Sequence, residues 1–198
     1  MWSNLISGFF GAVFAVVTTY WLQEYSKRKE HKRNINALLL SIKTEITVLQ
    51  ERFNNSFGTI KQIDGPIMSY YFIEQNYFLV LEGQAPLLGT IIDENLRALI
   101  IKTYIHVKSL IDSFKTNNIT LAKYEDINSF ILQNPLNPCA QEVKEKYELV
   151  LDGYAESIRV LLQETESNII CLFSLIDKYL RKQSIVCFKC GGRKSTLM

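Results

Sequence analysis

Residues 36–53 read NALLLSIKTEITVLQERF, and the apolar side chains of this stretch repeat with a helical period. From Ile35 onward they recur at alternating steps of four and three: Ile35, Leu39, Ile42, Ile46, Leu49 and Phe53. A mean period of 3.5 residues is typical of a seam along which helices pack side by side. The seam covers fewer than three heptads. It therefore predicts either a coiled coil between subunits or one stripe of an intramolecular bundle.

Further helices are predicted after this seam, and they give an all-α fold. An Asp-Gly-Pro sequence at 64–66 suits the start of a helix. The residues that follow it are rich in Tyr and Phe, so a strand is the alternative. Asp93 suits the cap of a long amphipathic helix, and Asn117 and Asn118 are expected to end it. The predicted helices cover residues 66–83, 93–115, 120–133 and 139–182. The expected architecture is an antiparallel helical bundle.

The N-terminal 23 residues carry no charge, and Leu5–Leu22 is almost wholly apolar. Trp2 and Trp21 would lie about 28 Å apart along a helix, close to the thickness of a bilayer core of about 30 Å. We therefore predict a transmembrane helix over residues 1–23, with a signal peptide and a buried helix as the alternatives. Because residues 14–57 contain neither Gly nor Pro, this helix is expected to continue into the seam.

A basic collar follows the predicted span, over residues 24–34. It consists of Lys27, Arg28, Lys29, Lys32 and Arg33. The positive-inside rule places the N-terminus outside and the body in the cytoplasm, as in a single-pass protein of the inner membrane, with the collar at the lipid headgroups of the bilayer. The net charge of +2 divides into +3 for residues 1–33, from five basic and two acidic side chains, and −1 for the rest. No specific nucleic-acid partner is predicted, because the body carries no basic excess.

Small residues recur at helical spacing within the predicted span. They are Ser7, Gly8, Gly11, Ala12 and Ala15. Such a stripe lets a second helix approach closely, and small residues are also simply common in membrane helices. We take the stripe as a prediction of self-association into a homo-oligomer.

The sharpest local motif is a CxxC followed by two glycines, formed by Cys187 and Cys190. Two thiolates at this spacing are half of a zinc site, and a complete site needs two more donors. Cys139 and Cys171 lack the spacing of a second CxxC, and Cys171 is expected to be a buried small side chain. Inert thiols, a zinc site and a redox pair all remain open, and the tail over residues 184–198 is expected to be flexible.

No common catalytic motif occurs in the sequence: no phosphate-binding loop, dinucleotide fingerprint, nucleophile elbow or metalloprotease helix. His106 is a general-base candidate, but a lone helical histidine without a partner in the sequence favours a structural role. Glu142, Glu145 and Glu148 alternate with lysines and indicate an exposed charged face. The sequence predicts that the protein is not an enzyme and has no cofactor apart from a candidate zinc ion.

The stretches WLQEYSKRKEHKRNINALLLSIKTEI (21–46) and LLGTIIDENLRALIIKTYIHVKSLI (87–111) together resemble a loose group of small bacterial proteins. Members of this group have one N-terminal membrane span, a basic collar and a helical cytosolic part, and some occur in phage-defence gene neighbourhoods. The resemblance implies a membrane effector or scaffold of phage defence that acts by clustering. It implies no catalytic residue and does not extend to the CxxC motif.

Together these features predict a membrane-anchored, non-enzymatic interaction and assembly protein that forms homo-oligomers or docks a cytosolic protein. A zinc- or thiol-dependent membrane-bound regulator acting through Cys187 and Cys190 is the alternative, and an enzyme with a pocket in the aromatic stretch 70–78 is a third. The predicted divisions are an anchor (1–23), the collar (24–34), a helical bundle (35–183) and the tail (184–198).

Overall fold

The computed structural model of the chain contains four helices in the part that it describes, and no strand. It describes residues 2–57, 60, 64–71 and 78–191, with the side chains of 14–55, 60, 64–71 and 78–182. The elements are α1 (Trp2–Phe57), α2 (Leu79–Leu88), α3 (Glu94–Gln133) and α4 (Pro138–Gly191). The predicted all-α class is confirmed.

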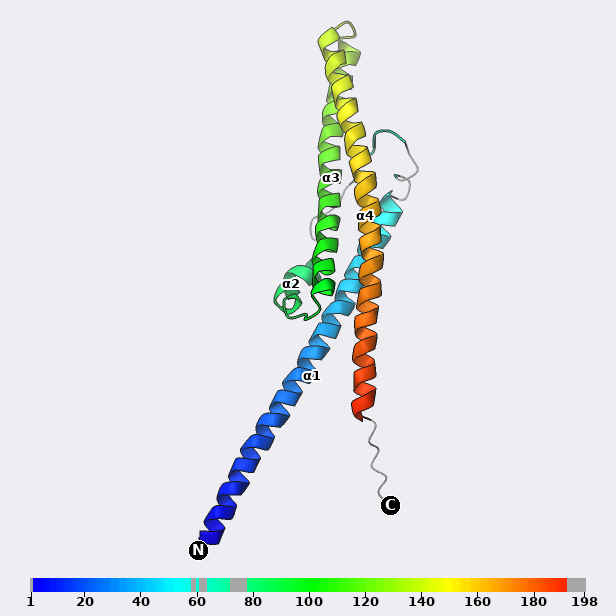
Figure 1. The fold of residues 1–198 in the computed structure, drawn as a ribbon. Coiled ribbons are helices and arrows are strands. Elements are labelled where there is room, and N and C mark those ends of the chain that lie inside the picture. Colours follow the sequence, from blue (N-terminus) through cyan, green and yellow to red (C-terminus); the bar gives the residue numbers. More distant parts are fainter. Residues whose placement is uncertain (1, 58–59, 61–63, 72–77, 192–198) are drawn as a thin grey trace.

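Helices α3 and α4 form a long antiparallel hairpin, and α1 crosses it at an angle (Figure 1). Asp93 caps α3 as predicted, because its Oδ1 accepts a hydrogen bond from the Leu96 backbone N–H at 3.1 Å. At the other end of the hairpin, Asn137 Oδ1 accepts from the N–H groups of Cys139 and Ala140 at 3.1 and 3.2 Å. Both caps satisfy amide donors that the first turn of a helix leaves without a partner.

The heptad seam of α1 faces the intramolecular core. Ile35, Leu39, Ile42, Ile46 and Leu49 are buried, and Phe53 packs against the same core. Their neighbours come from all of the other helices and include Leu88, Leu96, Ile100, Ile169, Leu172 and Ile176. The seam is thus one stripe of an intramolecular bundle rather than a coiled coil between subunits.

A second core lies further along the α3–α4 hairpin, under a segment that we call the strap (residues 60 and 64–71). Ile60 and Ile67 of the strap are buried with Phe114 of α3 and Ile158 of α4. Residues 64–71 of the strap are not helical, and Gly65 adopts a positive φ of 89° that favours glycine. The predicted helix start at residue 66 is therefore wrong, and α2 begins only at Leu79.

The predicted break at Asn117 and Asn118 is also wrong, because both residues lie inside α3. Asn117 Nδ2 donates to the backbone oxygen of Ile67 at 3.1 Å. Asn118 Oδ1 accepts from the N–H of Tyr71 at 3.1 Å, and its Nδ2 donates to the oxygen of the same residue at 2.7 Å. The two asparagines therefore bond to the strap instead of competing with the helical backbone.

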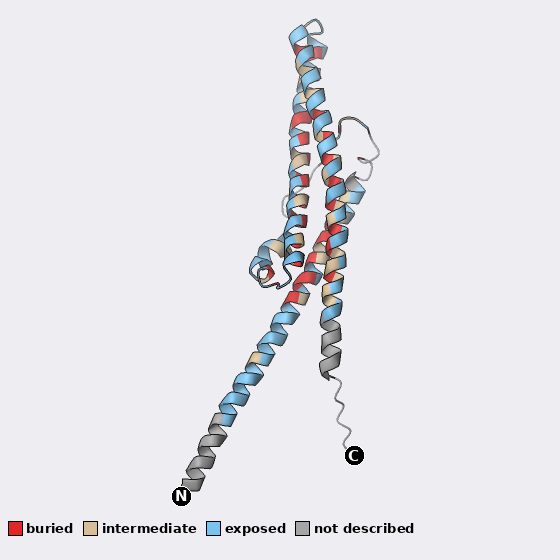
Figure 2. Ribbon diagram, in the orientation of Figure 1, coloured by how far each residue is buried: buried red, intermediate tan, exposed pale blue. Residues whose placement is uncertain are grey.

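Helix α1 runs without interruption from Trp2 to Phe57, as the lack of Gly and Pro in residues 14–57 predicted. Its N-terminal half leaves the body and projects away from α3 and α4 (Figure 1). We call residues 14–34 the projecting segment: every one of them is exposed except Glu24, which is half-buried. Figure 2 shows this exposed stretch ending where the buried seam begins.

The predicted membrane span requires a correction. Among the residues that the structure describes, no helix is both long enough and apolar enough to cross a bilayer. The side chains before residue 14 lie outside the described part. Because no described helix could cross a bilayer, the predicted single-pass location in the inner membrane is wrong.

Candidate interaction surface

The projecting segment carries a dense group of exposed apolar side chains at its N-terminal end. Phe14 and Trp21 are each 75% exposed, and Val16, Val17, Tyr20, Leu22 and Tyr25 are also exposed. Thr18 Oγ1 donates to the Phe14 oxygen at 2.6 Å, and Thr19 Oγ1 to the Ala15 oxygen at 2.8 Å. The two hydroxyl groups thus bond to their own helix, which lowers the polarity of this surface. An apolar patch of this density is typical of an interaction site.

The centre of the projecting segment combines the residue types that dominate binding energy at protein interfaces. Tyr20, Trp21, Glu24, Tyr25 and Arg28 line a shallow hollow of about 380 Å³. Arg28 Nε pairs with Glu24 Oε1 at 3.0 Å; the Arg28 side chain is largely in solvent, and the Glu24 side chain is half-buried. Tyr, Trp and Arg are enriched among interface hot spots, whereas an exposed ion pair adds little stability.

The predicted site residues on α1 fall into two groups. Ala15 and the five basic residues of the collar are described, and all six are exposed on the projecting segment. Ser7, Gly8, Gly11 and Ala12 lie in α1, but their side chains are outside the described part of the chain. The stripe of small residues therefore stays a prediction, apart from the exposure of Ala15.

The predicted CxxC site cannot be assembled from the described side chains. Helix α4 continues to Gly191, beyond its predicted end at 182, and the side chains of Cys187 and Cys190 lie outside the described residues. Cys171 is exposed, so its expected burial is wrong. Within the described part of the chain, no group of three His, Cys, Asp or Glu residues could hold a metal ion.

His106 has polar neighbours on α4 that the sequence did not reveal. Its Nδ1 lies 3.3 Å from Asn168 Nδ2 and 3.7 Å from Glu164 Oε2. The α3–α4 packing brings these groups together from positions about 60 residues apart, and an unaligned sequence carries no signal for such a pairing. These two contacts join α3 to α4.

A second polar cluster joins α1, α2 and α3. Glu45 accepts one hydrogen bond from the Tyr104 hydroxyl and another from the Val80 backbone N–H, the latter at 2.8 Å. Tyr104 is buried, and the Phe78 ring packs edge-on against it at 5.6 Å. Burial, together with the bond to the carboxylate, raises the pKa of Tyr104 far above its usual value. The hydrogen bonds of Glu45 to Tyr104 and Val80 thus link α1 to α3 and α2.

The groove between α1 and α2 holds about 460 Å³, a volume that would suit a small ligand. It is lined by Asn34, Ala37, Leu38, Ser41, Leu79, Val80, Gln84 and Leu87. None of these eight described side chains is charged, so the described lining of the groove is neutral.

The geometry thus defines an all-α protein with a covered core and one projecting helix with an apolar, aromatic surface. No family model, no curated protein and no solved structure matches the chain.

Proposed function

We propose that this protein is a non-enzymatic assembly protein that associates with copies of itself through the projecting segment of α1. One observation carries the proposal: Phe14, Trp21 and Tyr25 are 75%, 75% and 67% exposed on a helix that the body does not cover. Large aromatic side chains gain most from leaving water when they find a partner. A surface built this way favours association over catalysis.

The size of this surface supports a stable contact. An aromatic side chain buries about 150–250 Å² when it is fully covered. Because these side chains are already partly covered in one copy, three of them from each of two copies would remove up to about 650–1,100 Å² from water, close to the lower end of the range of about 1,200–2,000 Å² for a specific interface.

The polar clusters support a scaffold rather than a reaction centre. The hydrogen bonds of Glu45 and His106 connect helices of one chain, as described above. The zinc- or thiol-dependent alternative rests on Cys187 and Cys190, and no described contact favours it. We therefore assign the functional surface to α1.

Light scattering on the purified full chain, coupled to size-exclusion chromatography, tests the proposal. We expect oligomers that dissociate on dilution, and a dissociation constant at least about tenfold weaker for Trp21→Ala. Leu136→Ala is the matched control, because Leu136 is 94% exposed on the opposite end of the molecule and should leave assembly unchanged. A wild-type chain that stays monomeric at every concentration would contradict the proposal.

A further inference from the structure

We infer that the protein also binds single-stranded nucleic acid, without sequence preference, between the basic parts of α1 and α4. The binding surface consists of five exposed cations, which we call the basic fork: Lys29, Lys32, Lys178, Arg181 and Lys182. The inference goes beyond self-association, because the fork contains none of the aromatic side chains assigned to that contact.

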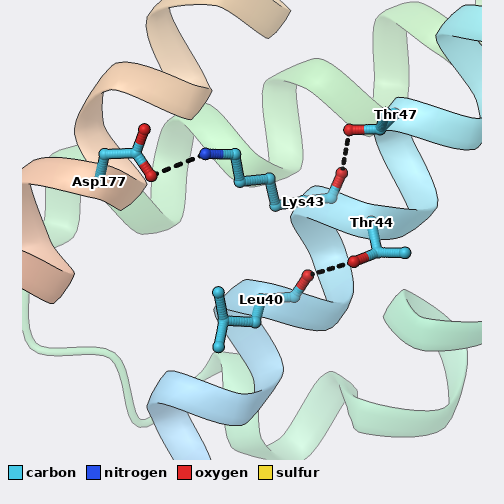
Figure 3. A network of polar contacts seen from close by, with 5 residues as sticks. All are labelled: Leu40, Lys43, Thr44, Thr47 and Asp177. Carbon is cyan, nitrogen blue, oxygen red and sulfur yellow. Dashed lines mark hydrogen bonds and ion pairs between the residues drawn. The ribbon is translucent and has the colours of Figure 1, made fainter.

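The fork begins where an ion pair joins its two helices. Lys43 Nζ of α1 lies 2.7 Å from Asp177 Oδ1 of α4 (Figure 3). Beyond this pair the two helices run toward the same end of the molecule and diverge (Figure 1). The fold therefore brings basic residues of α1 and α4 to one end, although 134 positions separate Lys43 from Asp177 in the sequence.

Helical spacing directs cations of both helices into the opening between them. Lys32 and Lys29 precede Lys43 by eleven and fourteen positions, close to three and four helical turns, so they share the face of α1 that meets α4. Arg181 follows Asp177 by four positions, so it lies on the same face of α4 as the ion pair. A hollow of about 340 Å³ lies beside the pair and is lined by Ser174, Asp177, Lys178, Arg181 and Lys182. A flat lipid surface cannot enter an opening between two helices, whereas a single strand can.

The cations of the fork have no anionic partner within the described part of the chain. None of the five forms an ion pair there, and the Asp177 carboxylate is paired with Lys43. Like charges that face one another repel, so an anion placed between them removes an unfavourable interaction.

The charge of the chain is segregated in the same sense. Residues 44–176 carry ten basic and seventeen acidic side chains, a net charge of −7. Residues 24–43 carry six basic and two acidic side chains, and residues 177–182 carry three and one, which gives +4 and +2. A molecule that is basic at one end and acidic elsewhere attracts a polyanion to the basic end.

Phosphodiester groups match the spacing of the fork. Lys29 and Lys32 are three positions apart, as are Lys178 and Arg181, which is about 4.5 Å along each helix. A strand within a duplex carries one negative charge per about 3.4 Å, and a free strand can adjust this spacing. Because contacts to phosphates read no base, the binding is independent of sequence.

Fluorescence anisotropy with a labelled single-stranded oligonucleotide of about 20 nucleotides tests the inference on the full chain. If four or five phosphates are neutralised, the dissociation constant should rise roughly 50- to 130-fold between about 50 and 200 mM salt. We expect Lys32→Gln and Arg181→Gln each to weaken binding at least about threefold and to lower the salt slope by about 0.7. Lys123→Gln is the matched control: it removes an exposed lysine of α3 outside the fork, and should change the dissociation constant less than about 1.5-fold.

Three results would overturn the inference. The first is no binding at low salt. The second is an equal loss in Lys123→Gln and Arg181→Gln, since net charge alone would then attract the strand. The third is binding to phosphatidylglycerol vesicles that fails in the fork variants, without binding of the oligonucleotide, since the partner would then be a lipid headgroup. Light scattering on the same samples reports self-association separately.

Discussion

Asn118 and Tyr71 form a reciprocal pair across the second core. The Asn118 amide donates to the Tyr71 oxygen at 2.7 Å and accepts from the Tyr71 N–H at 3.1 Å, as a neighbouring backbone would. The strap also receives hydrogen bonds from Arg159, whose Nε donates to the Ile60 oxygen at 3.4 Å and whose Nη2 donates to the Gly65 oxygen. The side chains of α3 and α4 therefore replace the secondary structure that the strap lacks.

Replacing Asn118 with leucine should destabilise the protein by about 1–3 kcal/mol, because two half-buried backbone groups lose their partner. Urea unfolding measures this loss. Hydrogen exchange at the Tyr71 amide should accelerate in the same variant, because that N–H is released. Asn118→Asp is the control, since it keeps the acceptor for Tyr71 and removes only the donor. If exchange at Tyr71 is unchanged in Asn118→Leu, the pair does not hold the strap.

Tyr104 should make stability depend on alkaline pH. Its folded-state pKa is raised by burial and by the bond to Glu45, so the unfolded chain loses the phenolic proton first as the pH rises. The Tyr104 hydroxyl thus contributes fully to the free energy of unfolding below about pH 10, the usual pKa of tyrosine. Above that pH the contribution falls by at most about 1.4 kcal/mol per pH unit. The difference in unfolding free energy between wild type and Tyr104→Phe isolates this effect. A difference that stays constant from pH 8 to about 11.5 would show that folding does not raise the pKa of Tyr104.

Lys43 and Asp177 should couple more strongly than Lys146 and Glu142, although both ion pairs measure 2.7 Å. The Lys43 and Asp177 side chains are 32% and 42% exposed, against 68% and 67% for the second pair. Lys43 Nζ also lies 5.4 Å from the centre of the Phe173 ring. Double-mutant cycles should give about 1 kcal/mol for the first pair and no more than about 0.5 kcal/mol for the exposed helical pair. Equal coupling energies would rule out a structural role for the first pair in joining α1 to α4.

The sequence predicts those parts of the fold that depend on neighbouring residues. The seam from Ile35 to Phe53, the continuity of α1 and the cap at Asp93 all follow from spacing and from local side-chain chemistry. The strap does not, because the partners of Ile67 and Tyr71 lie about 50 residues away in α3. An asparagine pair that ends a helix in isolation is stable inside one when a distant backbone accepts its hydrogen bonds.

The candidate surface was likewise predictable only in the part that depends on neighbouring residues. The exposed aromatic residues beside the collar are visible in the sequence, but only the fold shows that the body covers α1 from Ile35 onward and leaves residues 14–34 uncovered. The clusters at Glu45 and His106 are contacts between helices, so periodicity within one helix gives no signal for them.

Burial of Trp21 on association tests the central claim most directly. The chain contains two tryptophans, so a Trp2→Phe variant leaves Trp21 as the single reporter. Because Trp21 is 75% exposed in one copy, its emission should move to shorter wavelength, and its quenching by acrylamide should fall, as the protein concentration rises through the dissociation constant. Emission and quenching that remain those of an exposed tryptophan at every concentration, while the protein stays monomeric, would contradict self-assembly through α1.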